Sequence, residues 1–109
     1  MSTYMPDRWL IVEISVENSL PFRKVLAGWS GGYLNSDEWR MSSVIIDVIE
    51  HDDHFEVRNE SGSVYSCMKR RTGTTGLSAS VLKRVLSQHD PDNGFNVSVV
   101  EIESLLDKK

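Results

Sequence analysis

Three histidines and a single cysteine are the side chains of this sequence with the clearest capacity for chemistry. His51 and His54 flank Asp52-Asp53, and imidazole and carboxylate groups are zinc ligands. The two histidines are only three residues apart in a tight turn, however, and no further ligand cluster lies near them in the sequence. We therefore interpret them as part of a solvated turn, and the sequence predicts no metal and no other cofactor. His89 ends a predicted helix, where an imidazole suits the helix dipole.

Cys67 is the candidate nucleophile, and it would need a histidine beside it. It lies two residues after Tyr65 in a predicted strand, so both side chains are expected on the same face. Free cysteines on such faces usually pack in the core, although Lys69 and Arg70 would lower the pKa of this thiol if it were exposed. The sequence contains no Gly-x-Ser-x-Gly elbow. We therefore predict that the protein is not an enzyme.

The best candidate for an anion site is the segment from Arg70-Arg71 through Thr72-Gly73-Thr74-Thr75-Gly76, which leads into a predicted helix. Backbone N–H groups of a glycine loop and of a helix N-terminus attract phosphate or carboxylate. The segment is not a P-loop, because no lysine follows its second glycine. The alternative is a plain flexible connection between a strand and the helix.

Aromatic residues bracket an earlier glycine loop and suggest a stacking surface. Trp29, Tyr33 and Trp39 stand on either side of Gly31-Gly32, where they could stack on a base or another ligand ring. They could equally form corners of the core. If both loops lie at the same end of the fold, Trp29 and Trp39 would converge with Arg70 and Arg71 in a nucleic-acid or nucleotide site.

The distribution of charge suggests a different surface. The net charge is −4, which argues against a general nucleic-acid binder. Residues 47–60 carry six acids and one base, whereas residues 61–89 carry five bases and no acid. These charges are either plain solvated surface or a region that meets a charged partner. In the second interpretation another protein binds the acidic hairpin, and the predicted contact residues are Glu50, Asp52, Asp53 and Glu56.

Alternating apolar residues and turn signals predict the elements that position these side chains. The first six residues are expected to be a loose, flexible start that ends at Pro6. A helix is predicted over residues 79–88, with Ser78 as its N-cap. The long third strand is apolar on both faces, which we interpret as a bulge that swaps faces. The predicted strands cover residues 9–16, 22–29, 39–49, 54–58, 64–68 and 95–102.

These elements predict a mainly β (α+β) fold: a small, strongly bent antiparallel sheet or an SH3-like barrel of about six strands, with one helix in the C-terminal half. The 109 residues suit one domain over residues 1–109. No apolar run approaches the roughly 20 residues needed to span a bilayer. The single cysteine and the lack of a signal-peptide pattern favour the cytoplasm. The last strand could present an exposed edge to a second copy, but the sequence does not determine an oligomeric state.

Two short patterns resemble a group of small uncharacterised proteins of bacteria and their phages. The first is Trp29-Ser30-Gly31-Gly32-Tyr33, followed by Trp39-Arg40-Met41-Ser42-Ser43, and the second is Ser61-Gly62-Ser63-Val64-Tyr65. The resemblance spans about residues 25–86 and brings no catalytic residue with it. It implies an accessory protein of a phage or mobile element. The sequence as a whole predicts a non-enzymatic β-rich binding module that acts by protein–protein contact, with nucleic-acid or nucleotide binding as the alternative.

Overall fold

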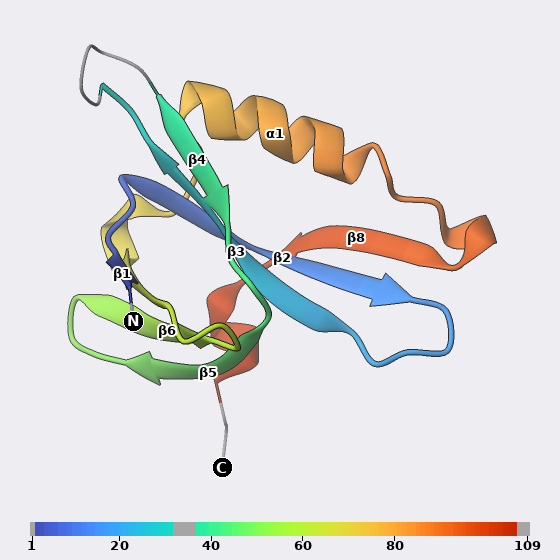
Figure 1. Ribbon diagram of the computed structural model, residues 1–109, viewed down its shortest axis with the longest axis horizontal. Coiled ribbons are helices and arrows are strands. Elements are labelled where there is room, and N and C mark those ends of the chain that lie inside the picture. The colour runs from blue at the N-terminus through green and yellow to red at the C-terminus, as the bar shows by residue number, and fades with distance from the viewer. Residues whose placement is uncertain (1, 32–36, 107–109) are drawn as a thin grey trace.

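Two small four-stranded sheets and one α-helix make up the computed structural model, which describes residues 2–31 and 37–106 (Figure 1). The mainly β prediction is confirmed, and of the two predicted shapes the described residues form open, bent sheets and no closed barrel. In spatial order, the first sheet contains β1 (Thr3–Tyr4), β7 (Val64–Met68), β6 (His54–Asn59) and β5 (Ile45–Glu50). The second contains β4 (Glu38–Met41), β3 (Phe22–Trp29), β2 (Arg8–Val16) and β8 (Phe95–Val100). The helical elements are η2 (Lys69–Arg71), α1 (Gly76–Leu86), η3 (Pro91–Asn93) and η4 (Ile102–Leu105).

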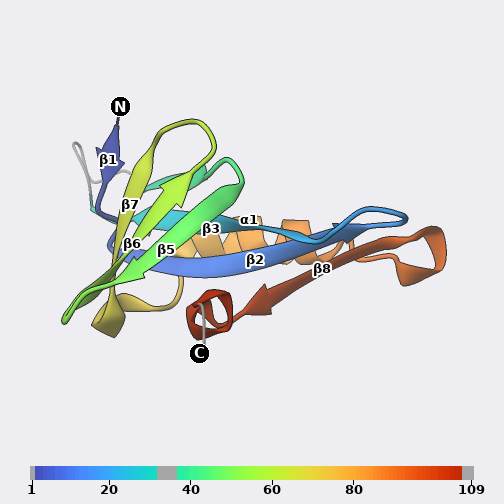
Figure 2. The same ribbon diagram turned by 90° about the horizontal axis from the view of Figure 1, so that it is seen from below.

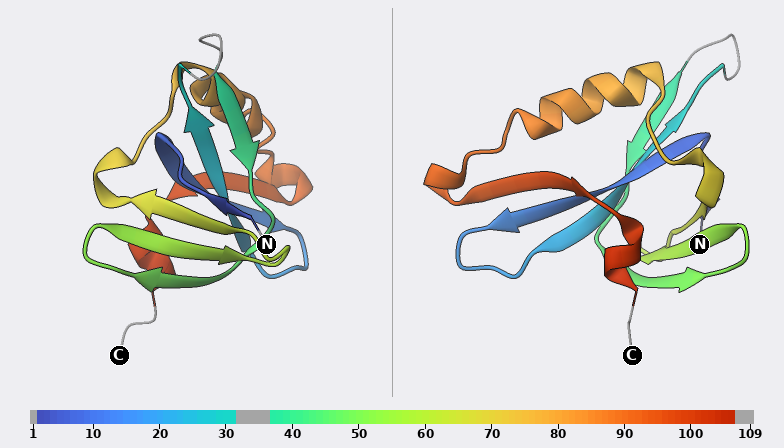
Figure 3. Two further views of the ribbon diagram at one scale, coloured as in Figure 1. Left: turned by 60° about the vertical axis from the view of Figure 1, so that its left-hand side comes forward. Right: turned by 180° about the vertical axis from the view of Figure 1, so that it is seen from behind.

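The hairpin of β2 and β3 forms the middle layer of the molecule. Because successive side chains of a strand point to opposite faces, Trp9 and Ile11 pack toward the first sheet, and Val12 packs toward α1 with Leu26 of β3. The second sheet is thus covered on both faces over its centre. Figure 3 shows α1 on one side of β2 and β3 and the hairpin of β5 and β6 on the other. Seen from below, β8 runs along β2 (Figure 2).

The long strand predicted over residues 39–49 is instead two strands, one in each sheet. The chain changes sheets at Ser42, which is buried and whose N–H donates to Val25 O at 2.9 Å. The Ser42 hydroxyl oxygen accepts a hydrogen bond from Val25 N at 2.8 Å. In a regular antiparallel ladder, the backbone carbonyl oxygen of Ser42 would accept this bond. The predicted bulge is present in β5, as a register shift between Ile45 and Asp47. As predicted, this bulge exchanges the faces of the strand, because Ile45 before it and Val48 after it both pack on the same core. The corner at Ser42 has a different effect, since it moves the chain from one sheet to the other.

The start of the chain also differs from the loose segment that we expected over residues 1–6. Thr3 and Tyr4 pair in parallel with β7, and Pro6 is among the most completely buried residues. The Tyr4 ring stacks on the Tyr65 ring at 4.9 Å between centroids. The sequence pattern missed this strand because two residues are too few to show alternation. The stacking of the Tyr4 ring on Tyr65 favours the pairing of the strand with β7.

Helix α1 begins earlier than predicted, with Thr75 rather than Ser78 as its N-cap. Thr75 and Ser78 form a reciprocal capping box: Ser78 N donates to Thr75 Oγ1 at 3.2 Å, and Thr75 N donates to Ser78 Oγ at 2.8 Å. The predicted apolar stripe is confirmed, since four helix residues pack on Val12, Leu26 and Val97. These four are Val81, Leu82, Val85 and Leu86. None of the helices in the described part of the chain has the length and apolar character required to cross a membrane.

Candidate functional site

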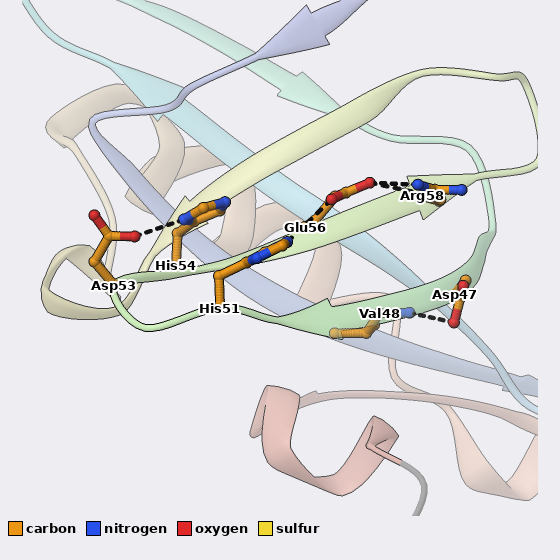
Figure 4. A network of polar contacts seen from close by, with 7 residues as sticks. All are labelled: Asp47, Val48, His51, Asp53, His54, Glu56 and Arg58. Carbon is orange, nitrogen blue, oxygen red and sulfur yellow. Dashed lines mark hydrogen bonds and ion pairs between the residues drawn. The ribbon is translucent and has the colours of Figure 1, made fainter.

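The turn between β5 and β6 holds a network of paired charges (Figure 4). The rings of His51 and His54 stack at 4.5 Å between centroids. His51 Nε2 donates to Glu56 Oε1 at 3.1 Å, and His54 Nδ1 donates to Asp53 Oδ1 at 2.7 Å. Arg58 Nε donates to the other oxygen of Glu56 at 2.8 Å. Within residues 2–31 and 37–106, no group of three or more His, Cys, Asp or Glu side chains is placed to hold a metal ion.

These hydrogen bonds favour the charged carboxylates. The hydrogen bond from Arg58, followed by that from His51, holds the pKa of Glu56 below its ordinary 4.5. The hydrogen bond from His54 holds the pKa of Asp53 below its ordinary 3.8. Both carboxylates are therefore fully ionised near neutral pH, but each already has a partner on its own hairpin.

Two of the four residues of the predicted acidic contact, Glu50 and Glu56, are paired with a lysine or an arginine. Glu50 Oε2 lies 2.7 Å from Lys69 Nζ, and Asp53 and Glu56 have the partners described above. Of the four predicted contact residues, only Asp52 forms no ion pair with any residue that the structure describes. It is exposed at the tip of the hairpin.

The basic segment after β7 is held against the start of β2 by Trp9. Trp9 Nε1 donates to Met68 O at 2.7 Å, just before η2. Beyond η2, Gly73 N donates to Trp9 O at 2.9 Å, in a short parallel bridge between Trp9 and Thr72. On the other side, Lys69 N donates to Asp53 O at 3.0 Å. These bonds bring together the acidic hairpin tip and the basic segment, which are separate regions in the sequence.

Between them lies a hollow of about 650 Å³, which we call the arginine hollow. Three of its lining residues, Arg8, Arg70 and Arg71, form no ion pair with any residue in the described part of the chain. The full lining consists of Arg8, Asp52, Asp53, Met68, Lys69, Arg70 and Arg71. Arg8 was not among the predicted site residues, because only the bridge between Trp9 and Thr72 brings it beside η2, and such a long-range contact leaves no local sequence signal.

The tryptophans of the alternative site lie apart from the predicted arginines. Trp29 Nε1 donates to Met5 O at 3.0 Å, and its ring packs edge-on against Tyr4. Trp39 is 43% exposed and shares with Trp29 a separate hollow of about 380 Å³, in which Arg40 is the cationic residue. Both tryptophans thus line this second hollow, and neither lines the hollow that contains Arg70 and Arg71. Tyr33 lies outside the described residues.

The helix N-terminus does not take part in the arginine hollow. We expected its backbone N–H groups to help bind an anion, but the capping box of Thr75 and Ser78 occupies this end, and both residues are buried. Neither residue lines the hollow. The anion-binding capacity of this region rests on the arginine side chains.

The remaining chemical candidates have structural roles. The predicted burial of Cys67 is confirmed: its side chain is 0% exposed, and burial raises the pKa of the thiol to about 12. His89 Nδ1 accepts a hydrogen bond from Val97 N at 3.1 Å. His89 therefore ties the segment after α1 to β8.

Comparisons with known proteins identify no family for this chain. No protein-family model matches the chain, and no curated protein and no solved structure is significantly similar to it. The resemblance to small bacterial and phage proteins stays a prediction from the sequence. The function must therefore be argued from the geometry of the site.

Proposed function

We propose that this protein is a small non-enzymatic binding module that contacts another protein through the arginine hollow. One observation carries the proposal: Arg8, Arg70 and Arg71 line a single hollow without ionic partners among the described residues. A guanidinium group can bind a carboxylate through two parallel hydrogen bonds. Because these three groups need not first break an internal ion pair, a partner carboxylate can bind them at low cost.

The carboxylates at the edge of the same hollow favour a partner of mixed charge. Asp52 has no ion pair among the described residues, and Asp53 is held by His54. A partner that places acidic groups on the arginines and a lysine or arginine on Asp52 would satisfy both charges. Complementary charges of this kind determine which partner binds and in which orientation. Arginine is also enriched among the residues that dominate the binding energy of protein interfaces.

Nucleic-acid or nucleotide binding is the second candidate, and the three arginines, which have no ion pair among the described residues, favour it as well. Two observations weigh against it. Asp52 and Asp53 line the same hollow and would repel a continuous phosphate backbone, as would the net charge of −4. In addition, Trp39, which is exposed enough to stack on a base, lines a different hollow. A protein partner fits the mixed charge better.

The non-enzymatic part of the proposal is supported by the state of the candidate nucleophile. Cys67 is buried, and the raised pKa of its thiol disfavours the reactive thiolate near neutral pH. A single cysteine cannot form a disulfide within the chain, which supports a cytoplasmic location. We also propose that the protein is an accessory protein of a phage or mobile element, a role that rests on the sequence resemblance alone.

Charge reversal in the hollow, with a matched control on the helix, tests the proposal. Arg70→Glu/Arg71→Glu reverses two adjacent exposed bases at the hollow, and Lys83→Glu/Arg84→Glu reverses two adjacent exposed bases on α1. Both variants change the net charge equally. Tagged wild type and both variants are incubated with bacterial lysate, with and without nuclease, and the retained molecules are identified.

We expect a discrete protein to survive nuclease treatment, to be retained by the wild type and by the helix control, and to be lost with Arg70→Glu/Arg71→Glu. Retention by both variants alike would overturn the role of the hollow. Retention of nucleic acid alone, abolished by nuclease and by high salt, would replace this function with the second candidate, since phosphate contacts weaken steeply with salt.

A further inference from the structure

No strand that the structure describes pairs with the outer edge of β4, and the hydrogen-bonding pattern shows which of its residues direct their backbone groups outward. Ser42 N donates to Val25 O, so the backbone of Ser42 faces β3. Backbone groups of successive residues in an antiparallel pair face alternately toward and away from the partner strand. The register between β3 and β4 continues unbroken from this pair. The backbone N–H and C=O groups of Arg40 therefore also point toward β3, whereas those of Trp39 and Met41 point outward. Beyond β4 the sheet has no further strand among the described residues (Figure 1).

The side chains of β4 divide between the two faces of the sheet. Trp39 lies directly opposite Gly28, and opposite residues of a strand pair share a face. A Cβ at Gly28 would touch α1. The Trp39 side chain therefore projects on the helix side, where it is 43% exposed. Glu38 and Arg40 project on the other side, and the Arg40 guanidinium lies 4.7 Å from the centroid of the Tyr4 ring. The edge thus carries one exposed aromatic residue flanked by one acid and one base.

We propose that a second copy of this chain binds along β4, edge to edge and antiparallel, with Trp39 at the two-fold axis. The outward-facing backbone of Trp39 can form a mutual hydrogen-bonded pair with Trp39 of the second copy. One residue to either side, Glu38 of each copy faces Arg40 of the other. A two-fold interface places the same patch on both subunits, and this patch is self-complementary in charge as well as in backbone hydrogen bonding.

The other sheet edges do not offer this combination. The charged residues of β5 are Asp47 and Glu50, so two copies of that edge would bring like charges together. The edge strand β8, for which the sequence suggests self-pairing, carries no charged residue between Phe95 and Val100, so no charge pair would select its register. With two residues, β1 is too short. Charge complementarity singles out β4.

Charge swaps at Glu38 and Arg40 test this interface directly. In Glu38→Arg each copy would place an arginine opposite Arg40, and in Arg40→Glu each would place a glutamate opposite Glu38. Either change converts two cross-strand attractions into two repulsions and should weaken the dimer about tenfold or more. The double variant Glu38→Arg/Arg40→Glu restores opposite charges and should restore the affinity of the wild type. Equimolar mixing of the two single variants should yield a heterodimer.

Sedimentation velocity over a range of protein concentrations measures these affinities, and circular dichroism confirms that each variant is folded. A wild type that sediments as a monomer at the highest concentration that stays in solution would overturn the proposal. So would a dimer that the single charge reversals do not weaken, because it would form through another surface. The variant Arg70→Glu/Arg71→Glu should dimerise like the wild type, which separates this interface from the arginine hollow.

Discussion

The indole N–H of Trp9 donates to the carbonyl oxygen of Met68, and the two atoms lie 2.7 Å apart. On the far side of η2, Gly73 N donates to the backbone oxygen of the same tryptophan. One residue of β2 therefore holds both ends of the short segment that carries Arg70 and Arg71. The position of the arginine hollow depends on this buried side chain as much as on the arginines.

Replacement of Trp9 by phenylalanine should therefore lower both stability and binding. The shorter ring leaves the Met68 carbonyl without its donor and leaves a void in the core, where Trp9 is only 2% exposed. We expect the free energy of unfolding, measured by urea denaturation, to fall by about 1–3 kcal/mol. Trp39→Phe is the matched control and should cost less than about 0.5 kcal/mol, because Trp39 is 43% exposed. Equal losses in the two variants would contradict this account of Trp9.

Gly28 is where β3 passes beneath the start of α1. A Cβ at this position would lie 2.7 Å from Thr75 Oγ1 and from Ser78 Oγ, which form the capping box. Gly28→Ala should therefore displace the helix start and reduce the free energy of unfolding by about 1–3 kcal/mol. At Gly76, in contrast, the nearest atom to an added Cβ is an Asp37 carboxylate oxygen at 3.8 Å. Gly76→Ala should be neutral or stabilising by up to about 1 kcal/mol, since alanine favours the helix. Thermal or urea unfolding of both variants checks this contrast.

The buried thiol of Cys67 should make the protein sensitive to alkali. Burial raises the pKa of this thiol from an ordinary 9.0 to about 12. Below about pH 8 the thiol is almost fully protonated in both the folded and the unfolded chain and contributes little to the pH dependence. Between pH 9 and 12 the unfolded chain loses this proton first, so the free energy of unfolding falls, by at most about 1.4 kcal/mol per pH unit.

Urea denaturation at several pH values from 8 to 11, compared between wild type and Cys67→Ala, measures this contribution. We expect the variant to lose stability less steeply above pH 9. Burial raises the pKa of Tyr65 to about 12 as well, so part of the alkaline loss should persist in the variant. Identical slopes for the two proteins would show that Cys67 titrates normally in the folded state.

The sequence predicted those parts of the fold that show local periodicity. The hairpin of β2 and β3, the hairpin of β6 and β7 and the apolar stripe of α1 all appear where alternation or helical spacing indicated them. The corner at Ser42 was missed, because a run of β-branched residues looks the same whether it stays in one sheet or crosses to another. Strand β1 was missed because its stability comes from Tyr4 packing on Tyr65, a contact between distant parts of the chain.

The same distinction applies to the candidate site. Arg70 and Arg71 were recognised because they are adjacent to each other and to a glycine loop. Arg8 was not, because the chain between Arg8 and Arg70 runs through six strands before the two side chains line one hollow. The acidic residues were recognised as a cluster, but the pairing of Glu50 with Lys69 depends on strand register, because Glu50 ends β5 and Lys69 follows β7. Local composition shows where charges are, and only the fold shows which of them are paired.

Asp52 provides the sharpest test of what the arginine hollow binds. It is exposed at the hairpin tip and lines the hollow without an ion pair among the described residues. Asp52→Asn removes one negative charge with little change in shape. Glu60→Gln removes one negative charge from the opposite end of the same hairpin and is the matched control. Isothermal titration of the captured partner and of an oligothymidylate into each variant measures the effect.

If a protein of mixed charge is the partner, Asp52→Asn should weaken its binding several-fold, because a basic group of the partner loses its counter-charge. The same variant should bind the oligothymidylate more tightly than the wild type, because the repulsion of phosphate by Asp52 is gone. Glu60→Gln should change neither affinity appreciably. Tighter binding of the captured protein by Asp52→Asn would mean that the partner presents only acidic groups to the hollow, and that Asp52 opposes binding instead of selecting the partner.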